Sequence, residues 1–293
     1  MGISDALPKL GGLNEYGLAA YKTTGGFAQQ EVQWLLSIGG IEVRSNQQLG
    51  SDFTLASLLS AYDAVFLGIG LAGVNSLGLP EPRGAGVRDA VEFIAELRQS
   101  DPAAVAVGRN VVVIGGGMTA VDAAVQSRLL GAETATIVYR RGPAAMSASA
   151  HEQAWAQNNG VTIRHWAAPK EVLCESGVLR GVRFAETALQ GGKLIETGET
   201  FTLQADMLLK AIGQTLISSP VAAALELKQG RIVTDADGRT SAPRVWAGGD
   251  CRYGGQDLTV EAVEHGKRAA VAIDAALRSA AGTNPTMQET HHG

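Results

Sequence analysis

The sequence predicts an α/β fold built around a parallel sheet, and three observations support this prediction. The chain has 293 residues, of which 45% are hydrophobic, so it is long enough for about two domains with separate cores. Several apolar runs have the length and composition of strands that are buried on both faces. Many of the 37 glycines follow these runs directly, as expected where the strands of an α/β protein turn closely into helices.

The elements follow from periodicity and from turn residues. Helical spacing over residues 118–130 predicts a helix that ends at Gly131, and a second helix is expected from near Ser149 to Asn158. Short alternating segments over 171–205 predict an antiparallel meander, and the Pro- and Gly-rich stretch 78–86 predicts a linker. Four apolar runs are predicted to be buried parallel strands, namely residues 64–67, 110–114, 134–139 and 207–212.

Two segments match the pattern G-x-G-x-x-[GA], and their context separates them. The segment that begins with Gly115, Gly116 and Gly117 and continues through Met118 and Thr119 closes an apolar strand and opens the helix over 118–130. Such a corner lets a backbone approach a pyrophosphate whose charge rests on a helix N-terminus, so we predict a dinucleotide site here. Residues 68–73 also follow a strand, but no helix fits after them, so a tight backbone crossing is expected there.

The end of the next strand indicates which dinucleotide is bound. An Asp or Glu about 20 residues after the glycines would hold the ribose 2′-hydroxyl of NAD, but this strand ends in Arg140 and Arg141. Two guanidinium groups can bind a 2′-phosphate, which favours NADPH over NADH. In the alternative interpretation, both arginines are merely solvated at the strand end.

A second nucleotide-binding element is predicted near the C-terminus. An apolar strand runs into Gly248, Gly249 and Asp250, and an Ala-rich helix begins after a short polar loop. An Asp at a strand end can accept a hydrogen bond from a sugar hydroxyl, and the first N–H groups of the helix can face an electron-rich ring.

Together these segments resemble the FAD/NAD(P)H reductase module of the glutamate synthase small subunit and dihydropyrimidine dehydrogenase family. Within that family the resemblance is to the electron-input subunits of bacterial NAD(P)-dependent dihydropyrimidine dehydrogenases. It rests on residues 111–141, 211–213 and 246–250 in the correct order and covers about residues 10–276. The resemblance implies two interleaved Rossmann-like domains of the pyridine nucleotide-disulfide oxidoreductase type. We therefore expect an FAD-binding domain over 1–80 and 216–293 and an NAD(P)H-binding domain over 81–215.

The resemblance also assigns residues to the two cofactors. For the nicotinamide dinucleotide it implies a phosphate loop at Gly116–Thr119, a 2′-phosphate clamp at Arg140 and Arg141, and backbone beside the nicotinamide at Ala211, Ile212 and Gly213. A third basic residue found in some relatives is Ser147 here, and the dihydropyrimidine branch uses NADH, so the cofactor is written NAD(P)H. For FAD the implied residues are Leu13, Lys22, Gly249, Asp250, Leu258, Thr259 and Val260.

One departure from the family concerns the flavin. The family places a G-x-G-x-x-G strand, a helix and an acidic strand end before the segment matched by Gly11, Gly12 and Leu13, where this sequence has ten residues. The cysteine-rich ferredoxin-like region of the family is also not found in this sequence. We therefore expect an incomplete FAD domain that binds FAD weakly or not at all.

Composition and charge narrow the choice of partners. The net charge of −5 gives no basic excess for nucleic acid, and the most apolar stretch is too short to span a membrane, so a cytoplasmic protein is predicted. Cys174 and Cys251 cannot build a four-cysteine cluster, and no metal site and no catalytic acid or base are predicted. Any iron–sulfur cluster is therefore expected on a partner subunit or in a missing N-terminal region, and an exposed sheet edge would favour homo-oligomers.

Two functional hypotheses follow. In the first, the chain is a reductase module that passes electrons from NAD(P)H through FAD toward a dihydropyrimidine dehydrogenase partner, or in the glutamate synthase branch toward another acceptor. In the second, the chain binds the dinucleotide without turnover and needs another chain to complete its flavin site. A dye-reduction assay with added FAD distinguishes the two hypotheses.

Overall fold

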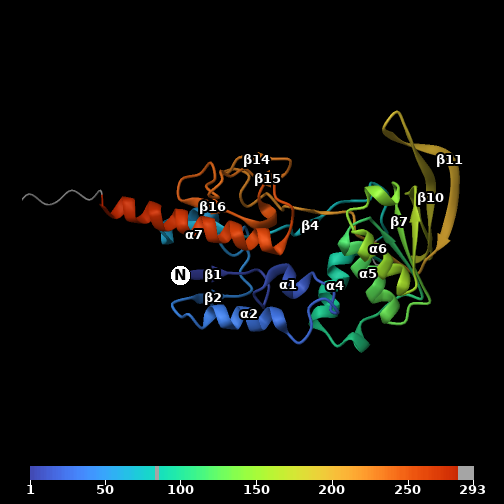
Figure 1. Cartoon of the computed structure of the whole chain (residues 1–293), viewed down its shortest axis with the longest axis horizontal. Coiled ribbons are helices and arrows are strands. Elements are labelled where there is room, and N and C mark those ends of the chain that lie inside the picture. Colours follow the sequence, from blue (N-terminus) through green and yellow to red (C-terminus); the bar gives the residue numbers. More distant parts are fainter. Residues whose placement is uncertain (83–85, 283–293) are drawn as a thin grey trace, which may run out of the picture. The chain divides into compact units, whose positions relative to one another are not determined.

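The computed structural model describes residues 1–82 and 86–282, which divide into two compact units (Figure 1). Unit 1 comprises Met1–Pro8, Glu42–Gly73 and the described part of 214–293. Unit 2 comprises Lys9–Ile41 and Val74–Gly213. The main chain thus leaves unit 1 after Gly73 and returns to it at Gln214, so the predicted interleaving of two α/β units is present.

Unit 2 is built on a five-stranded sheet in the order β5-β12-β6-β7-β8, and every pair of neighbours is parallel. The predicted strands 110–114, 134–139 and 207–212 are confirmed as members of this sheet, although the last of them ends at Lys210. The strands are β5 (Val87–Asp89), β6 (Asn110–Ile114), β7 (Thr134–Tyr139), β8 (Val161–His165) and β12 (Met207–Lys210). Because all five run in one direction, their carboxyl ends lie at the same edge of the sheet.

The two faces of this sheet bury alternate residues of each strand, as the period of two requires. Val111 and Val113 of β6 pack in a core with the helices, whereas Val112 and Ile114 pack in a second core with the meander. The helices of the first core are α4 (Ala90–Gln99), α5 (Met118–Leu129) and α6 (Ala150–Asn158), so both predicted helices are confirmed. Continuous apolar runs arise here because each strand is covered on both sides.

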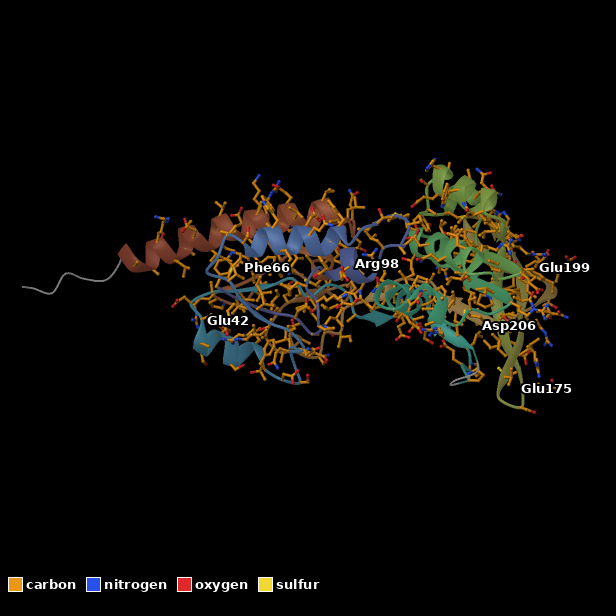
Figure 2. All side chains as sticks on the ribbon, turned by 90° about the horizontal axis from the view of Figure 1, so that it is seen from below. Glu42, Phe66, Arg98, Glu175, Glu199 and Asp206 are labelled. Atoms are coloured by element: carbon orange, nitrogen blue, oxygen red, sulfur yellow. The ribbon has the colours of Figure 1, made fainter. Side chains whose placement is uncertain are left out.

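The second core is closed by the predicted antiparallel meander, whose strands are ordered β11-β10-β9. These strands are β9 (Ala167–Glu175), β10 (Val178–Gln190) and β11 (Lys193–Gln204). Figure 2 marks Glu175, with which β9 ends, and Glu199 on β11. A β-bulge between Ala185 and Thr187 interrupts the pairing of β10 with β11. Such bulges bend a strand and can redirect a side chain or a backbone group.

Unit 1 contains two short parallel pairs of strands. The predicted strand 64–67 is β3 (Val65–Leu67), which pairs with β16 (Val245–Ala247), and β1 (Gly2–Ser4) pairs with β2 (Glu42–Arg44). The unit also holds α3 (Leu55–Ala61), α7 (Thr259–Gly282), and the hairpin of β14 (Leu227–Lys228) and β15 (Arg231–Ile232). No helix follows 68–73, where β4 (Gly73–Val74) pairs with β13 (Gln214–Thr215). None of the described helices is long and apolar enough to cross a bilayer.

The unit boundaries differ from the expected domain boundaries at three places: residues 9–41 and 74–80 belong to unit 2, and residues 214–215 belong to unit 1. Lys9–Ile41, which holds α1 (Gly12–Tyr16) and α2 (Phe27–Leu36), belongs to unit 2, although the family resemblance places all of residues 1–80 in one domain. One physical reason is Arg98 of α4, labelled in Figure 2, whose guanidinium donates hydrogen bonds of 2.7–3.0 Å to the carbonyl oxygens of Glu15, Thr23 and Asn14. Residues 83–85 of the predicted linker lie outside the described residues.

Candidate functional site

The glycine corner between β6 and α5 has the geometry that the sequence predicts for a phosphate loop. A Cβ on Gly115, whose φ is 153°, would lie 2.2 Å from the carbonyl oxygen of Ala211. A Cβ on Gly116 would lie 2.5 Å from the ring of Tyr139. Only glycine therefore allows the loop to pass between β7 and the end of β12, and it does so at the shared carboxyl edge of the sheet.

Gly117 differs from the two glycines before it, because no main-chain atom or ring of the described residues crowds the position of its Cβ. A Cβ there would meet only the Ser147 hydroxyl, at 3.2 Å, and the backbone has ordinary extended angles. Behind it, Ala120 is fully buried, so the helix packs closely on the sheet. In a dinucleotide-binding loop the glycines allow a tight turn, access for a phosphate, and close packing of the helix against the strand, and the geometry of this corner is compatible with these three roles.

The first turn of α5 presents hydrogen-bond donors at this corner. Within the described residues, no acceptor takes the main-chain N–H of Gly117, Met118 or Thr119. No side chain caps the helix, whose N-cap is Gly117. Uncapped N–H groups at the positive end of a twelve-residue helix can donate hydrogen bonds to an anion, so the prediction of a diphosphate site here stays open.

Arg140 and Arg141 follow β7 at the same edge, one strand away from the glycine corner. Both side chains are exposed, and no described residue pairs with either guanidinium. Their main chains, in contrast, are held, because the carbonyl oxygens of Arg140 and Arg141 accept hydrogen bonds from the Thr187 hydroxyl (2.8 Å) and the Trp166 N–H (3.2 Å). The structure thus fixes the backbone and leaves two cationic groups available for a ligand.

Ala211, Ile212 and Gly213 follow β12 and complete this edge. The N–H of Ala211 donates to the carbonyl oxygen of Ile114 over 2.8 Å, which ties the segment to the strand before the glycine corner. The Asn75 side-chain amide donates to the carbonyl oxygens of Ile212 (3.1 Å) and Gly213 (3.2 Å). The predicted nicotinamide segment therefore lies beside the predicted phosphate loop and is held in place by hydrogen bonds with Ile114 and Asn75.

The second predicted element lies at the end of β16 in unit 1. Gly249 has a φ of 70°, and its N–H donates to Nδ1 of His265 over 3.2 Å. Asp250 is half-buried, and no described residue donates a hydrogen bond to its carboxylate. Burial and the nearby Asp257 carboxylate raise the pKa of Asp250, against the opposing guanidinium of Arg231. A half-buried carboxylate with free acceptor positions suits a ligand that offers hydroxyl groups.

The remaining predicted flavin residues fall into two groups. Leu258 directly precedes α7, and Thr259 and Val260 begin it; all three are exposed and belong to unit 1. Leu13 and Lys22 instead belong to unit 2, together with the glycine corner. The Lys22 ammonium is paired with Asp122 at 2.7 Å and with Glu152 at 3.2 Å.

The Lys22 pair is part of a buried polar cluster that sequence reasoning missed. Asp122 of α5 is 3% exposed and also accepts a hydrogen bond of 3.0 Å from the Tyr21 hydroxyl. Burial opposes the charge of Lys22, but the hydrogen bonds to Asp122 and Glu152 raise its pKa overall. These contacts hold residues 19–22 against α5. The role of Lys22 toward a flavin stays a prediction.

Four further residues near the carboxyl edge of the unit 2 sheet were not predicted as part of the site. Asn75 and Thr187 left no signal in the sequence, because each acts on backbone that is distant along the chain. Trp166 gave one signal, since it directly follows an apolar strand, as Arg140 does. The need for a glycine at position 142 follows only from its contact with the Trp166 ring, which the sequence does not show.

Comparison with known proteins identifies the family. The family model described as pyridine nucleotide-disulphide oxidoreductase matches residues 11–266. The chain belongs to this family. The membership confirms the predicted class, an NAD(P)H-dependent oxidoreductase fold whose family cofactors are a pyridine nucleotide and FAD.

Several relatives of this oxidoreductase chain are subunits of larger enzymes. It is 33% identical to the NADP(+)-dependent formate dehydrogenase subunit beta of Moorella thermoacetica, over 98% of this chain and 42% of that protein. It is 32% identical to the glutamate synthase (NADPH) small chain of Escherichia coli (strain K12), over 92% of this chain and 62% of that protein. It is 30% identical to the NAD-dependent dihydropyrimidine dehydrogenase subunit PreT of Salmonella typhimurium, over 95% of this chain and 63% of that protein.

The chain therefore spans between about two fifths and two thirds of the length of these relatives. Solved structures confirm the fold of the oxidoreductase family. FprA from Mycobacterium tuberculosis in complex with NADPH superimposes with a TM-score of 0.76 at 17% identity, over 96% of this chain and 78% of that one.

Proposed function

We propose that this chain is an NAD(P)H-dependent flavin oxidoreductase module that passes electrons from a nicotinamide dinucleotide through FAD toward a partner subunit. The observation that carries the proposal is the edge of the unit 2 sheet. At adjacent strand ends lie three N–H groups at the start of α5 and two arginines after β7 that have no partner among the described residues. This arrangement supports binding of the two phosphate positions of NADPH, with the diphosphate at the N–H groups and the 2′-phosphate at the arginines.

The residues of the chain bind and orient the cofactor, and no side chain is needed as a general acid or base. When bound, the pyridine nucleotide supplies a hydride that the flavin accepts. The N–H groups of Gly117, Met118 and Thr119 would hold the diphosphate, and Arg140 and Arg141 would hold the 2′-phosphate. The 211–213 backbone, fixed by Asn75, would then lie beside the nicotinamide end.

For FAD the described residues supply only part of a site. Asp250 offers acceptor positions to the hydroxyl groups of a flavin side chain. Within the described residues of unit 1, however, no glycine corner joins a strand to a helix as Gly115–Gly117 does in unit 2, and no helix follows 68–73. We therefore propose that this chain binds NAD(P)H readily and binds FAD weakly.

The partner is proposed from chemistry and from relatives. Cys174 and Cys251 are both free, and one is buried, so these two thiols cannot carry a four-cysteine cluster. We propose that an iron–sulfur subunit takes the electrons and delivers them to a dihydropyrimidine dehydrogenase-type catalytic subunit. The glutamate synthase alternative has equal support, because the two relatives match this chain at 30% and 32% identity over similar lengths.

Two measurements on the purified chain test the proposal. An absorbance spectrum with a NADPH titration reports bound flavin and dinucleotide affinity, and a dye-reduction assay with and without added FAD reports turnover. We expect saturable NADPH binding, little flavin absorbance, and dye reduction that depends on added FAD. NADPH binding without dye reduction at saturating FAD would instead support a binding module that lacks turnover. A chain that millimolar NADPH leaves unchanged contradicts both functions.

A further inference from the structure

Trp166 has a backbone conformation that bulky residues seldom adopt. It follows β8 directly, and its φ of 59° lies in the left-handed region. Side chains other than glycine are strained there, and the strain persists only where surrounding contacts hold the residue. Residues held in this way tend to occur at sites that bind ligands.

The contacts that hold Trp166 also hold the arginine pair. The N–H of Trp166 donates to the carbonyl oxygen of Arg141 over 3.2 Å, and the carbonyl oxygen of Trp166 accepts from the N–H of Thr187 over 2.8 Å. The Thr187 hydroxyl donates to the carbonyl oxygen of Arg140 over 2.8 Å, and Thr187 itself is 5% exposed. One buried threonine at the β10 bulge thus fixes both the arginine pair and the tryptophan.

The indole of Trp166 lies against the residue that follows the arginines. A Cβ on Gly142 would be 2.7 Å from Cζ2 and 3.1 Å from Cε2 of the indole. Gly142 has a φ of −75° and a ψ of 169°, which any residue can adopt, so the glycine serves to make room for the ring. Trp166 is still 36% exposed, so part of this residue is available to a ligand.

The strand register places the main chain of Trp166 beside the arginine pair at the carboxyl edge of the unit 2 sheet. Ile114 pairs with Val138 and Tyr139 pairs with His165, so β6, β7 and β8 end side by side. The phosphate loop, the arginine pair and Trp166 follow these three strands in that order. We propose that Trp166 is the platform on which the adenine ring of the nicotinamide dinucleotide stacks while the arginines bind its 2′-phosphate. This inference rests on the proposed function and extends it to the adenosine half of the cofactor.

The magnitude expected follows from stacking of bases on aromatic side chains. Loss of such a platform weakens binding by about 5- to 150-fold per base. We therefore expect Trp166→Ala to weaken the binding of NADPH and of adenosine 2′,5′-bisphosphate by this factor. Trp166→Phe keeps an aromatic ring, so we expect it to retain most of the affinity. Trp155, which is 43% exposed on α6, offers a matched control, so Trp155→Ala is expected to leave both affinities unchanged.

The experiment is an equilibrium titration of the full chain and these variants with three probes. NADPH reports the whole site, adenosine 2′,5′-bisphosphate reports the adenosine half, and nicotinamide mononucleotide lacks the adenine. If Trp166 is the platform, Trp166→Ala should lose affinity for NADPH and adenosine 2′,5′-bisphosphate and should keep its affinity for nicotinamide mononucleotide. Adenosine 2′,5′-bisphosphate should also quench tryptophan fluorescence in the unaltered chain, and this quenching should disappear in Trp166→Phe.

A second variant keeps the test valid if Trp166→Ala fails to fold. Gly142→Ala has no backbone strain, but its methyl group displaces the indole, so the same loss of adenosine 2′,5′-bisphosphate affinity is expected. If the unaltered chain binds NADPH and both Trp166→Ala and Gly142→Ala bind it equally well, the platform is wrong and the proposed function stands. If the unaltered chain binds neither NADPH nor adenosine 2′,5′-bisphosphate, the proposed function fails and the platform fails with it.

Discussion

Replacement of Arg140 and Arg141 by alanine tests whether this edge recognises a 2′-phosphate. Both side chains are exposed and neither guanidinium is paired with a described residue, so their removal breaks no internal ion pair. The carbonyl oxygens that anchor this segment belong to the backbone and remain in the variants. We therefore expect the stability of the fold to change by less than about 0.5 kcal/mol, as is usual for surface substitutions.

The effect on binding should be large and specific to the phosphorylated cofactor. A hydrogen bond to a charged group contributes about 1.5–3 kcal/mol, which corresponds to a factor of about 10 to 150 in affinity. Each single variant should lose about this factor for NADPH, and the double variant should lose more. NADH has no 2′-phosphate, so its affinity should stay within about threefold, a change of under 1 kcal/mol. The NADPH/NADH preference should therefore fall by the same factor as the NADPH affinity.

The assay is a fluorescence or calorimetric titration of each variant with NADPH and with NADH. Arg109 supplies a matched control, because it precedes β6, away from the carboxyl edge of the sheet, and pairs with Glu133 at 2.6 Å. Arg109→Ala should leave both affinities unchanged. If the double variant keeps the NADPH/NADH preference of the unaltered chain, Arg140 and Arg141 are only solvated at the strand end and the phosphate clamp is refuted.

Three further predictions concern the phosphate loop, a buried carboxylate and acid stability. Gly117→Ala should weaken NADPH binding by about 10-fold or more, because the added methyl group would keep the phosphate from its charge-assisted hydrogen bonds. Gly266 has open space beside it, so Gly266→Ala should leave the NADPH affinity unchanged. Asp122→Ala should lower the free energy of unfolding in urea by about 2–4 kcal/mol, because it leaves buried hydrogen-bond donors without an acceptor. An unchanged urea midpoint would contradict the buried cluster. Burial raises the pKa of Glu81, but hydrogen bonds from Lys210 and the Leu77 N–H lower it overall, so its stabilisation is present above pH 4.5 and is lost as the pH falls through the depressed value. Urea midpoints of the unaltered chain should thus fall more steeply below pH 4.5 than those of Glu81→Gln, and parallel profiles would refute this.

The sequence by itself determined the strand–helix–strand unit. Local physics suffices there, because an apolar run, three consecutive glycines and a helical period occur within about thirty residues. The strands 110–114 and 134–139 and the helix that begins at Met118 are found as predicted, and the glycines have the spacing that a phosphate loop needs.

Only the tertiary structure decided how distant segments meet. Thr187 joins the backbones of Arg140 and Trp166 from a bulge in β10, and no local pattern indicates that contact. The same holds for Lys22, which the family resemblance assigned to the flavin and which the fold pairs with Asp122 in α5. Hydrogen bonds and ion pairs between residues about fifty to a hundred positions apart depend on strand register and helix packing, and neither is encoded in the local sequence.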